Sequence, residues 1–176
     1  MGKSGTLSEK NLHRVRRSGW MSAFLMTLFI AVLVTLTPLY PPGLRSAVMQ
    51  AFAGVCHQLP HRSPHVAGIQ LAVCHRCLGI YWALPLAALL YAMTRGFWPI
   101  RGKGGILILL LAGLPAAVDW LGDVLGWWVN TPASRMTTGA MFGLTAGYFF
   151  TRAVTDIVSE RVRKKTSKRL DRASKP

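Results

Sequence analysis

Residues 18–44 read SGWMSAFLMTLFIAVLVTLTPLYPPGL, a stretch of 27 positions without a charged side chain. Its apolar part covers residues 20–39, and an α-helix needs about 20 apolar residues to cross the hydrocarbon core of a bilayer. Pro38, Pro41 and Pro42 then end the helix, because proline lacks the N–H that the next helical hydrogen bond requires. The stretch therefore predicts a membrane-spanning helix, and with it an integral membrane protein.

Three further stretches are long and apolar enough to cross a membrane as helices. The first two are residues 70–93 and 104–127. The last is closed by Arg135 and Arg152, whose long stems can extend toward the interface. We therefore expect an all-α fold, an integral membrane bundle of four transmembrane helices: 20–39, 70–93, 104–127 and 134–154.

The predicted outer loop, residues 40–69, contains one more uncharged segment, residues 46–61. This segment is bracketed by prolines and contains several polar residues, which argues against a fifth crossing. Five apolar residues in it recur at helical spacing: Ala47, Val48, Ala51, Phe52 and Val55. We expect a short extracytoplasmic helix that lies on the membrane surface.

The 176-residue chain carries 21 Lys and Arg residues against 6 Asp and Glu residues, a formal net charge of +15. Even so, 51% of the residues are hydrophobic and only 15% are charged. A soluble basic domain or a disordered polycation would contain far fewer apolar residues. The composition therefore excludes a disordered chain and argues against a nucleic-acid partner; the expected partner is the lipid bilayer.

The distribution of basic residues predicts the orientation, because cytoplasmic segments are enriched in Lys and Arg. Seventeen of the 21 basic residues lie in the arm 1–19, the loop 95–103 and the segment from Arg152 onward, which includes the tail 155–176. The other four are Arg45, Arg62, Arg76 and Arg135. Both termini are therefore expected in the cytoplasm, as four spans require.

The first apolar run exceeds a typical signal-peptide core, so we expect an uncleaved anchor. The tail could also bind anionic lipids.

All three cysteines fall on the predicted outer side, in Cys56-His57 and in Cys74-His75-Arg76-Cys77. Positions i and i+3 share a helix face, so Cys74 and Cys77 can point at one centre. Three thiolates and the imidazole of His57 suit zinc, whereas iron–sulfur clusters usually take four thiolates. A disulfide with one odd thiol and an inert buried cluster are the alternatives.

Other histidines have weaker claims as ligands. His13 lies in the basic arm. His57, His61 and His65 are spaced by four, but Pro60 and Pro64 between them prevent a common helix face. His75 would project about 100° away from Cys74 on a helix.

Polar residues also interrupt the outer ends of the predicted spans. Asp119 and Asp123 are four positions apart and share a helix face, while Asn130, Arg76 and Arg135 are expected at a similar height. Ionisable groups at this depth are costly and normally face protein or a water-filled cavity. They form either an ion-pair network that fixes helix packing or a pocket for a ligand or a proton relay.

These residues resemble the pattern of the DUF2085 family, small prokaryotic multispan membrane proteins without an assigned activity. The likeness runs from Cys56-His57-Gln58-Leu59-Pro60 through Cys74-x-Arg76-Cys77 to Arg135-x-x-Thr138-Gly139. It implies a prokaryotic plasma (inner) membrane location and a shared outer site. The implied site residues are Cys56, His57, Arg62, Cys74, Arg76, Cys77, Asp119, Asn130 and Arg135. Trp120 departs from the pattern, which often has glycine there.

The expected function is a membrane protein with an extracytoplasmic Cys/His site that binds a metal, with zinc favoured. A membrane thiol–disulfide redox protein is the main alternative, followed by a small transporter and by an accessory structural subunit of a larger membrane complex. Other membrane subunits or a second copy of the chain, in a homo-oligomer, are the further partners to consider. Gly139, Gly143 and Gly147 recur every fourth residue and predict a close helix–helix contact. No hydrolase motif occurs, and the motifs assign no reaction.

Overall fold

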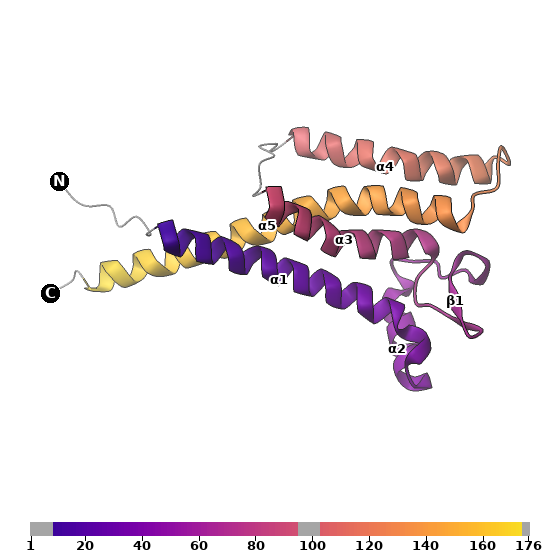
Figure 1. Ribbon diagram of the computed structural model, residues 1–176, viewed down its shortest axis with the longest axis horizontal. Helices are drawn as coiled ribbons and strands as arrows, with labels where there is room; N and C mark the ends of the chain where they lie inside the picture. Colours follow the sequence, from indigo (N-terminus) through magenta and orange to yellow (C-terminus); the bar gives the residue numbers. More distant parts are fainter. Residues whose placement is uncertain (1–8, 95–102, 174–176) are drawn as a thin grey trace.

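The computed structural model describes residues 9–94 and 103–173. Four long helices run along one axis, with the start of the first and the end of the last at one end and the described loops at the other (Figure 1). We call these the terminal end and the loop end of the bundle. The five α-helices are α1 (Glu9–Thr35), α2 (Pro42–Ala53), α3 (His75–Thr94), α4 (Lys103–Val124) and α5 (Pro132–Ala173).

Three of the described helices are long and apolar enough to cross a membrane: Val15–Thr35, His75–Thr94 and Gly104–Val124. They correspond to the first three predicted spans, so those three predictions are confirmed by the length and composition of the helices. The fourth predicted span lies within α5, and the structure does not confirm it as a crossing. Glycine and threonine recur in that segment and lower its hydropathy below that of the other three.

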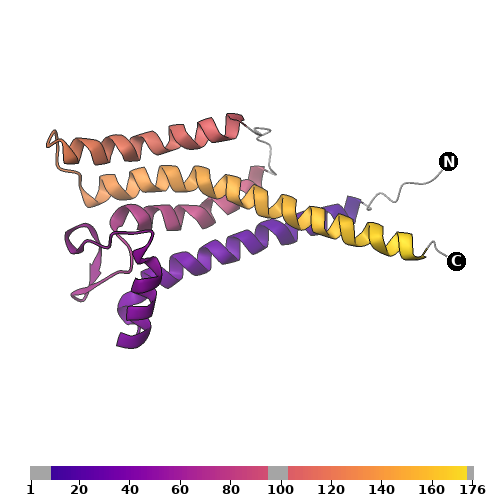
Figure 2. The same ribbon diagram turned by 180° about the vertical axis from the view of Figure 1, so that it is seen from behind.

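Helix α5 is 42 residues long, which at 1.5 Å per residue corresponds to about 63 Å, twice the thickness of a hydrocarbon core. Its second half continues past α3 and α4 alongside the first half of α1, as Figures 1 and 2 both show. A Cβ at Gly19 would lie 2.8 Å from the Cα of Thr155, so the two helices are in backbone contact there. Of the basic residues used to predict orientation, Lys3, Arg95, Arg101 and Lys175 lie outside the described residues.

The α3–α5 contact is built on glycine, as the spacing predicts. A Cβ added at Gly139 would overlap the carbonyl oxygen of Arg76, and one added at Gly79 would overlap the carbonyl oxygen of Met136. Small residues let two helices approach to backbone contact. The pairing therefore fixes the start of α3, where two cysteines and Arg76 lie, against the start of α5.

We expect Gly139→Ala to destabilise the protein, because the new methyl group meets backbone rather than a movable side chain. Overpacking of this kind costs about 1–3 kcal/mol, and more when backbone must shift. Thermal unfolding of the detergent-purified protein would measure the loss. Gly43→Ala is the matched control: Gly43 lies in α2 with nothing within 4 Å of an added Cβ, so alanine should be neutral or slightly stabilising. Equal melting temperatures for the two variants would contradict the close contact.

The loop end differs from the sequence prediction in two ways. The surface helix is α2, which begins at Pro42 and ends at Ala53, so it starts earlier than predicted and stops before Cys56. Proline suits the first position of a helix, because the N–H it lacks would have no helical partner there.

The second difference is a small antiparallel hairpin of β1 (His65–Val66) and β2 (Ile69–Gln70), so the fold is mostly rather than purely helical. Both turn residues, Ala67 and Gly68, have positive φ values of 50° and 76°, as a two-residue hairpin turn requires. The turn sequence Ala-Gly contains the glycine of the usual Asn-Gly or Asp-Gly turn but not its first residue, so the sequence alone does not predict the hairpin.

A compact apolar cluster holds the loop against the bundle. It joins Val34 at the end of α1, Val48 of α2 and Leu78 of α3 to the loop residues Leu71, Ala72, Val73 and Cys56. The ring of Phe52 meets that of Tyr81 edge-on at 5.6 Å between centroids. The buried cluster gives the cysteine-bearing loop a fixed position.

Candidate metal centre and the adjoining polar network

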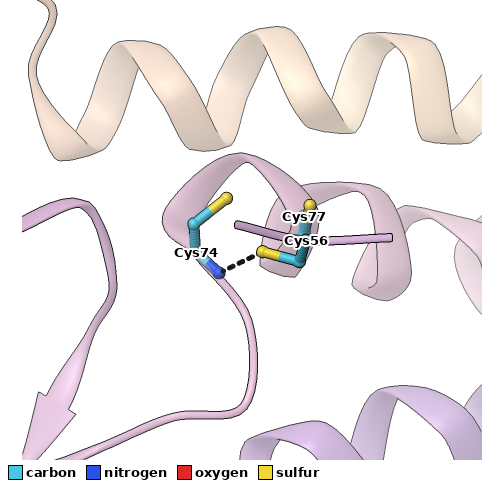
Figure 3. Close-up of side chains that lie close together, drawn as sticks. All are labelled: Cys56, Cys74 and Cys77. Carbon is cyan, nitrogen blue, oxygen red and sulfur yellow. Dashed lines mark hydrogen bonds between the residues drawn. The ribbon is translucent and has the colours of Figure 1, made fainter. Parts of the chain in front are cut away.

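The three cysteines meet at the loop end of the bundle. Cys56 follows α2, Cys74 directly precedes α3, and Cys77 lies in the first turn of α3. Their Sγ atoms all lie within 4.8 Å of one another, and all three thiols are free (Figure 3). The backbone N–H of Cys74 donates to the Sγ of Cys56 at 3.2 Å. The pair that shares a helix face and the distant third cysteine therefore form a single cluster.

Gln58 holds Cys56 in place. Its Nε2 donates to the carbonyl oxygens of Met49 and Ala72, both at 2.7 Å, and so ties the loop to α2 and to the segment before α3. Gln70 Nε2 in turn donates to the carbonyl oxygen of Gln58 at 2.6 Å. The backbone of Gln58 has φ of +50°, a conformation that these bonds help to maintain. Gln58 belongs to the sequence motif, but nothing in the motif's spacing indicates this positioning role.

The local environment distinguishes the thiols. The pKa of Cys74 is lowered, because the Cys56 and Cys77 thiols hydrogen-bond to its sulfur and backbone N–H groups of the first helical turn add to them. The pKa of Cys56 is raised by its hydrogen bond with Cys74 and by burial. A thiolate is the form that binds metal, and the hydrogen bonds from neighbouring groups favour that form at Cys74.

Among the described residues, no histidine nitrogen belongs to the sulfur cluster. His57 is exposed and lines the cavity in front of the cysteines, but its ring nitrogens are not among the atoms that gather within 4.8 Å. His75 places its Nδ1 2.7 Å from the carbonyl oxygen of Arg62, which ties the start of α3 to the loop. His61 and His65 are exposed loop residues.

Two ion pairs connect α4 with the loop end. Asp119 pairs with Arg76 of α3, and Asp123 Oδ2 accepts from Arg62 Nη2 at 2.9 Å. The carboxylates are one helical turn apart on α4, so each reaches a different arginine. The side chain of Asp119 is 10% exposed and that of Asp123 is 11% exposed, so both carboxylates are largely withdrawn from solvent.

Asn130 and Arg135 complete the network. The backbone N–H of Asn130 donates to Asp123 Oδ1 at 3.1 Å, and its Nδ2 donates to Asp119 Oδ2 at 3.3 Å. Its Oδ1 accepts from Arg135 Nε at 2.5 Å. Asn130 and Arg135 are both buried. All six polar residues singled out in the sequence therefore belong to one hydrogen-bonded network across α3, α4, α5 and the loop.

A cavity of about 400 Å³ opens between the cysteines and this network. All three cysteines line it, as do three arginines, and apolar side chains complete its wall. One of these is Trp120. The lining residues used below are Leu59, Arg62, Arg76, Ile80, Trp120 and Arg135.

Comparison with known proteins identifies a family over this part of the chain. A family model described as "Predicted membrane protein (DUF2085)" matches residues 56–149, more than half of the chain, and this range includes every residue of the cluster and the network. No solved structure matches.

Two archaeal relatives are similar to the same part of the chain. An uncharacterised protein of Methanocaldococcus jannaschii is 31% identical over 97 residues, which are 54% of this chain and 60% of that protein. An uncharacterised protein of Methanothermobacter thermautotrophicus is 29% identical over 98 residues, 55% of this chain and 85% of that protein. The chain thus spans less than two thirds of the first relative.

Proposed function

This chain belongs to the DUF2085 family of predicted membrane proteins, and we propose that it binds a metal ion, preferentially zinc, through Cys56, Cys74 and Cys77. The observation that supports the proposal is the gathering of three free sulfurs within 4.8 Å. Sulfurs that bind one zinc ion at about 2.3 Å in tetrahedral geometry lie roughly 3.8 Å apart. The cluster therefore needs only small side-chain adjustments to hold the ion.

The chemistry of the donors favours zinc over other metals. Thiolates select soft or borderline cations over magnesium and calcium. An iron–sulfur cluster usually takes four cysteines, and the chain has three.

We propose His57 as the fourth ligand, because it follows Cys56 directly and lines the same cavity. A Cys3His site is closed and structural, whereas three cysteines with a water molecule leave an open position of the kind that catalytic zinc sites use. The identity of the fourth ligand therefore bears on whether this family member is an enzyme.

A membrane thiol–disulfide redox protein is the second candidate. The lowered pKa of Cys74 and the short distances between the sulfurs favour it, because a thiolate is the attacking species in disulfide exchange. In that role two of the cysteines would cycle between dithiol and disulfide.

Metal content and thiol state, measured on the same preparation, test both candidates. The metal proposal expects about one zinc ion per chain by elemental analysis, and three thiols that react with an alkylating reagent only after chelation. Metal-free, folded protein with Cys74 and Cys77 oxidised would contradict it and support the redox candidate.

We further propose that the first half of α5, residues 134–154, is the fourth span, with both termini in the cytoplasm of a prokaryote and the cysteines on the outer side of its plasma membrane. The glycine contacts that hold this segment against α3 support the span, because they set it at the same depth as an apolar helix. The distribution of basic residues along the sequence supports the orientation, because 17 of the 21 lie in the arm, loop and tail that are predicted to be cytoplasmic.

Cysteine labelling tests this topology. A cysteine in place of the exposed His65 should react with a membrane-impermeant maleimide on intact cells, whereas one in place of the exposed Ser167 should react only after lysis. The parent chain supplies the background from the native cysteines. Labelling of Ser167→Cys on intact cells would contradict the proposed orientation.

Two partners are proposed from the surface. The exposed basic residues of the second half of α5, among them Arg161, Arg163, Lys165 and Lys168, would meet anionic lipid headgroups. Helix α4 packs on α5 and reaches α3 and the loop through its two ion pairs, but only 6% of its apolar window is buried. That face would contact lipid in a monomer, or a second subunit in a homo-oligomer or a larger membrane complex.

A further inference from the structure

The cavity in front of the cysteines is bordered by more positive than negative charge. Arg62, Arg76 and Arg135 line it, while the network behind them contains two carboxylates, Asp119 and Asp123. The two carboxylates pair with Arg62 and Arg76. Among the described residues no carboxylate lies within ion-pair distance of Arg135, although this arginine is only 9% exposed. A buried cation is costly unless an anion accompanies it.

The arginines also retain hydrogen-bond donors. Among the described residues, Arg135 donates only through Nε, to Asn130, which leaves both of its terminal amino groups for a ligand. The Nε atoms of Arg62 and Arg76 are buried, and neither has a hydrogen-bond partner among the described residues. Arginine presents its N–H groups in a planar fork that matches the oxygens of phosphate and carboxylate.

From this surplus of charge and donors we infer that the cavity is a binding site for a phosphate-type oxyanion, held chiefly by Arg135 with Arg62 and Arg76 beside it. The cavity volume of about 400 Å³ exceeds what a bare ion needs. Leu59, Ile80 and Trp120 supply an apolar wall that suits a carbon group attached to the phosphate. The phosphate could belong to a free ion or to a lipid headgroup. The inference does not depend on a metal at the cysteines.

The rival explanation is internal: the sulfur cluster, once deprotonated, would itself be the anion that balances Arg135. It makes an opposite prediction, because a cavity whose charge is already balanced has no affinity for phosphate.

Isothermal titration of the chelator-treated protein in dodecyl maltoside at low ionic strength tests the inference. The two probes are inorganic phosphate and dihexanoyl phosphatidylglycerol, a soluble lipid with a phosphodiester headgroup. We expect saturable 1:1 binding of at least one probe. Binding of both assigns the site to phosphate groups in general, and binding of the lipid alone assigns it to headgroups. Binding of neither overturns the inference.

Variants identify the site. Arg135→Gln should weaken binding by roughly 10- to 100-fold, the loss expected when charge-assisted hydrogen bonds are removed. Arg45→Gln is the control: Arg45 donates to the Tyr40 carbonyl and does not line the cavity, so binding should be unchanged. If Arg135→Gln does not fold, Leu59→Trp, which fills the cavity and leaves the arginines in place, should abolish binding. Unchanged affinity in a folded Arg135→Gln or Leu59→Trp protein would also overturn the inference.

Discussion

Serine at any one of the three cysteine positions is expected to remove nearly all of the bound metal. The reason is that three sulfurs within 4.8 Å would act as one donor set, and the metal holds all of them as thiolates. A serine hydroxyl at neutral pH does not replace a thiolate, so losing one donor weakens the whole centre. Elemental analysis of Cys56→Ser, Cys74→Ser and Cys77→Ser, purified side by side, should therefore give three similar losses.

How the loss of metal compares among the three variants is more informative than the size of each loss. A disulfide would make two replacements equally harmful and leave the third nearly silent. An inert cluster would give three mild and independent effects, because serine differs little from cysteine in volume. Three equivalent losses are thus specific to a shared metal ion, and any other pattern contradicts it.

Histidine variants extend this experiment to the fourth ligand. We expect His57→Ala to weaken metal retention without matching the cysteine variants, since three thiolates would remain. His61→Ala is the control, because His61 is an exposed loop residue that does not line the cavity. Equal metal retention in the two histidine variants would assign the fourth position to something other than His57.

The helices formed by the long uncharged segments were predictable, because a long run of apolar residues has few roles in a protein other than to cross a membrane. Residues 20–39, 70–93 and 104–127 correspond to α1, α3 and α4. The ends of the helices were less predictable: α1 begins well before its apolar part. Helix α5 continues to Ala173 through a basic segment that gives no membrane signal. Helical propensity and the contact with α1 extend these elements, and neither appears in a hydropathy pattern.

The cysteine cluster was predictable in part. The spacing of Cys74 and Cys77 requires a common face, and a connection of seventeen residues can return Cys56 to it. The local path of that connection depends on the hydrogen bonds of Gln58 and Gln70 and on two residues with positive φ in the hairpin turn. These are long-range or conformational features without a periodic signal. For the same reason the exposed position of His57 could not be deduced from its place beside Cys56.

The polar network was likewise predictable only in part. The four-residue spacing of Asp119 and Asp123 indicates a common helix face, but their partners lie 43 and 61 positions away along the chain. Which arginine meets which carboxylate follows only from how α3 and the loop pack on α4. The role of Asn130, which bonds both acids and Arg135, is likewise visible only in three dimensions.

Asp119→Ala is expected to cost roughly 3–5 kcal/mol of folding free energy, as the removal of one partner from a buried ion pair does. The change leaves Arg76 without its carboxylate and removes an acceptor of Asn130 Nδ2, at a site where the Asp119 side chain is 10% exposed. At about 2–4 °C per kcal/mol for a chain of this size, the Tm should fall by on the order of 10 °C. Thermal unfolding of the purified protein measures the change.

Two comparisons make this result specific. Glu160→Ala removes the acid of an ion pair with Lys164 whose side chains are 55% and 71% exposed, and exposed pairs contribute about 0–1 kcal/mol. Its Tm should therefore stay close to that of the parent chain. The double variant Asp119→Leu/Arg76→Met should recover much of the stability lost in Asp119→Ala, because replacing both charges leaves no ion unpaired. A stable Asp119→Ala protein with altered ligand binding would show instead that Asp119 serves the cavity and not the fold.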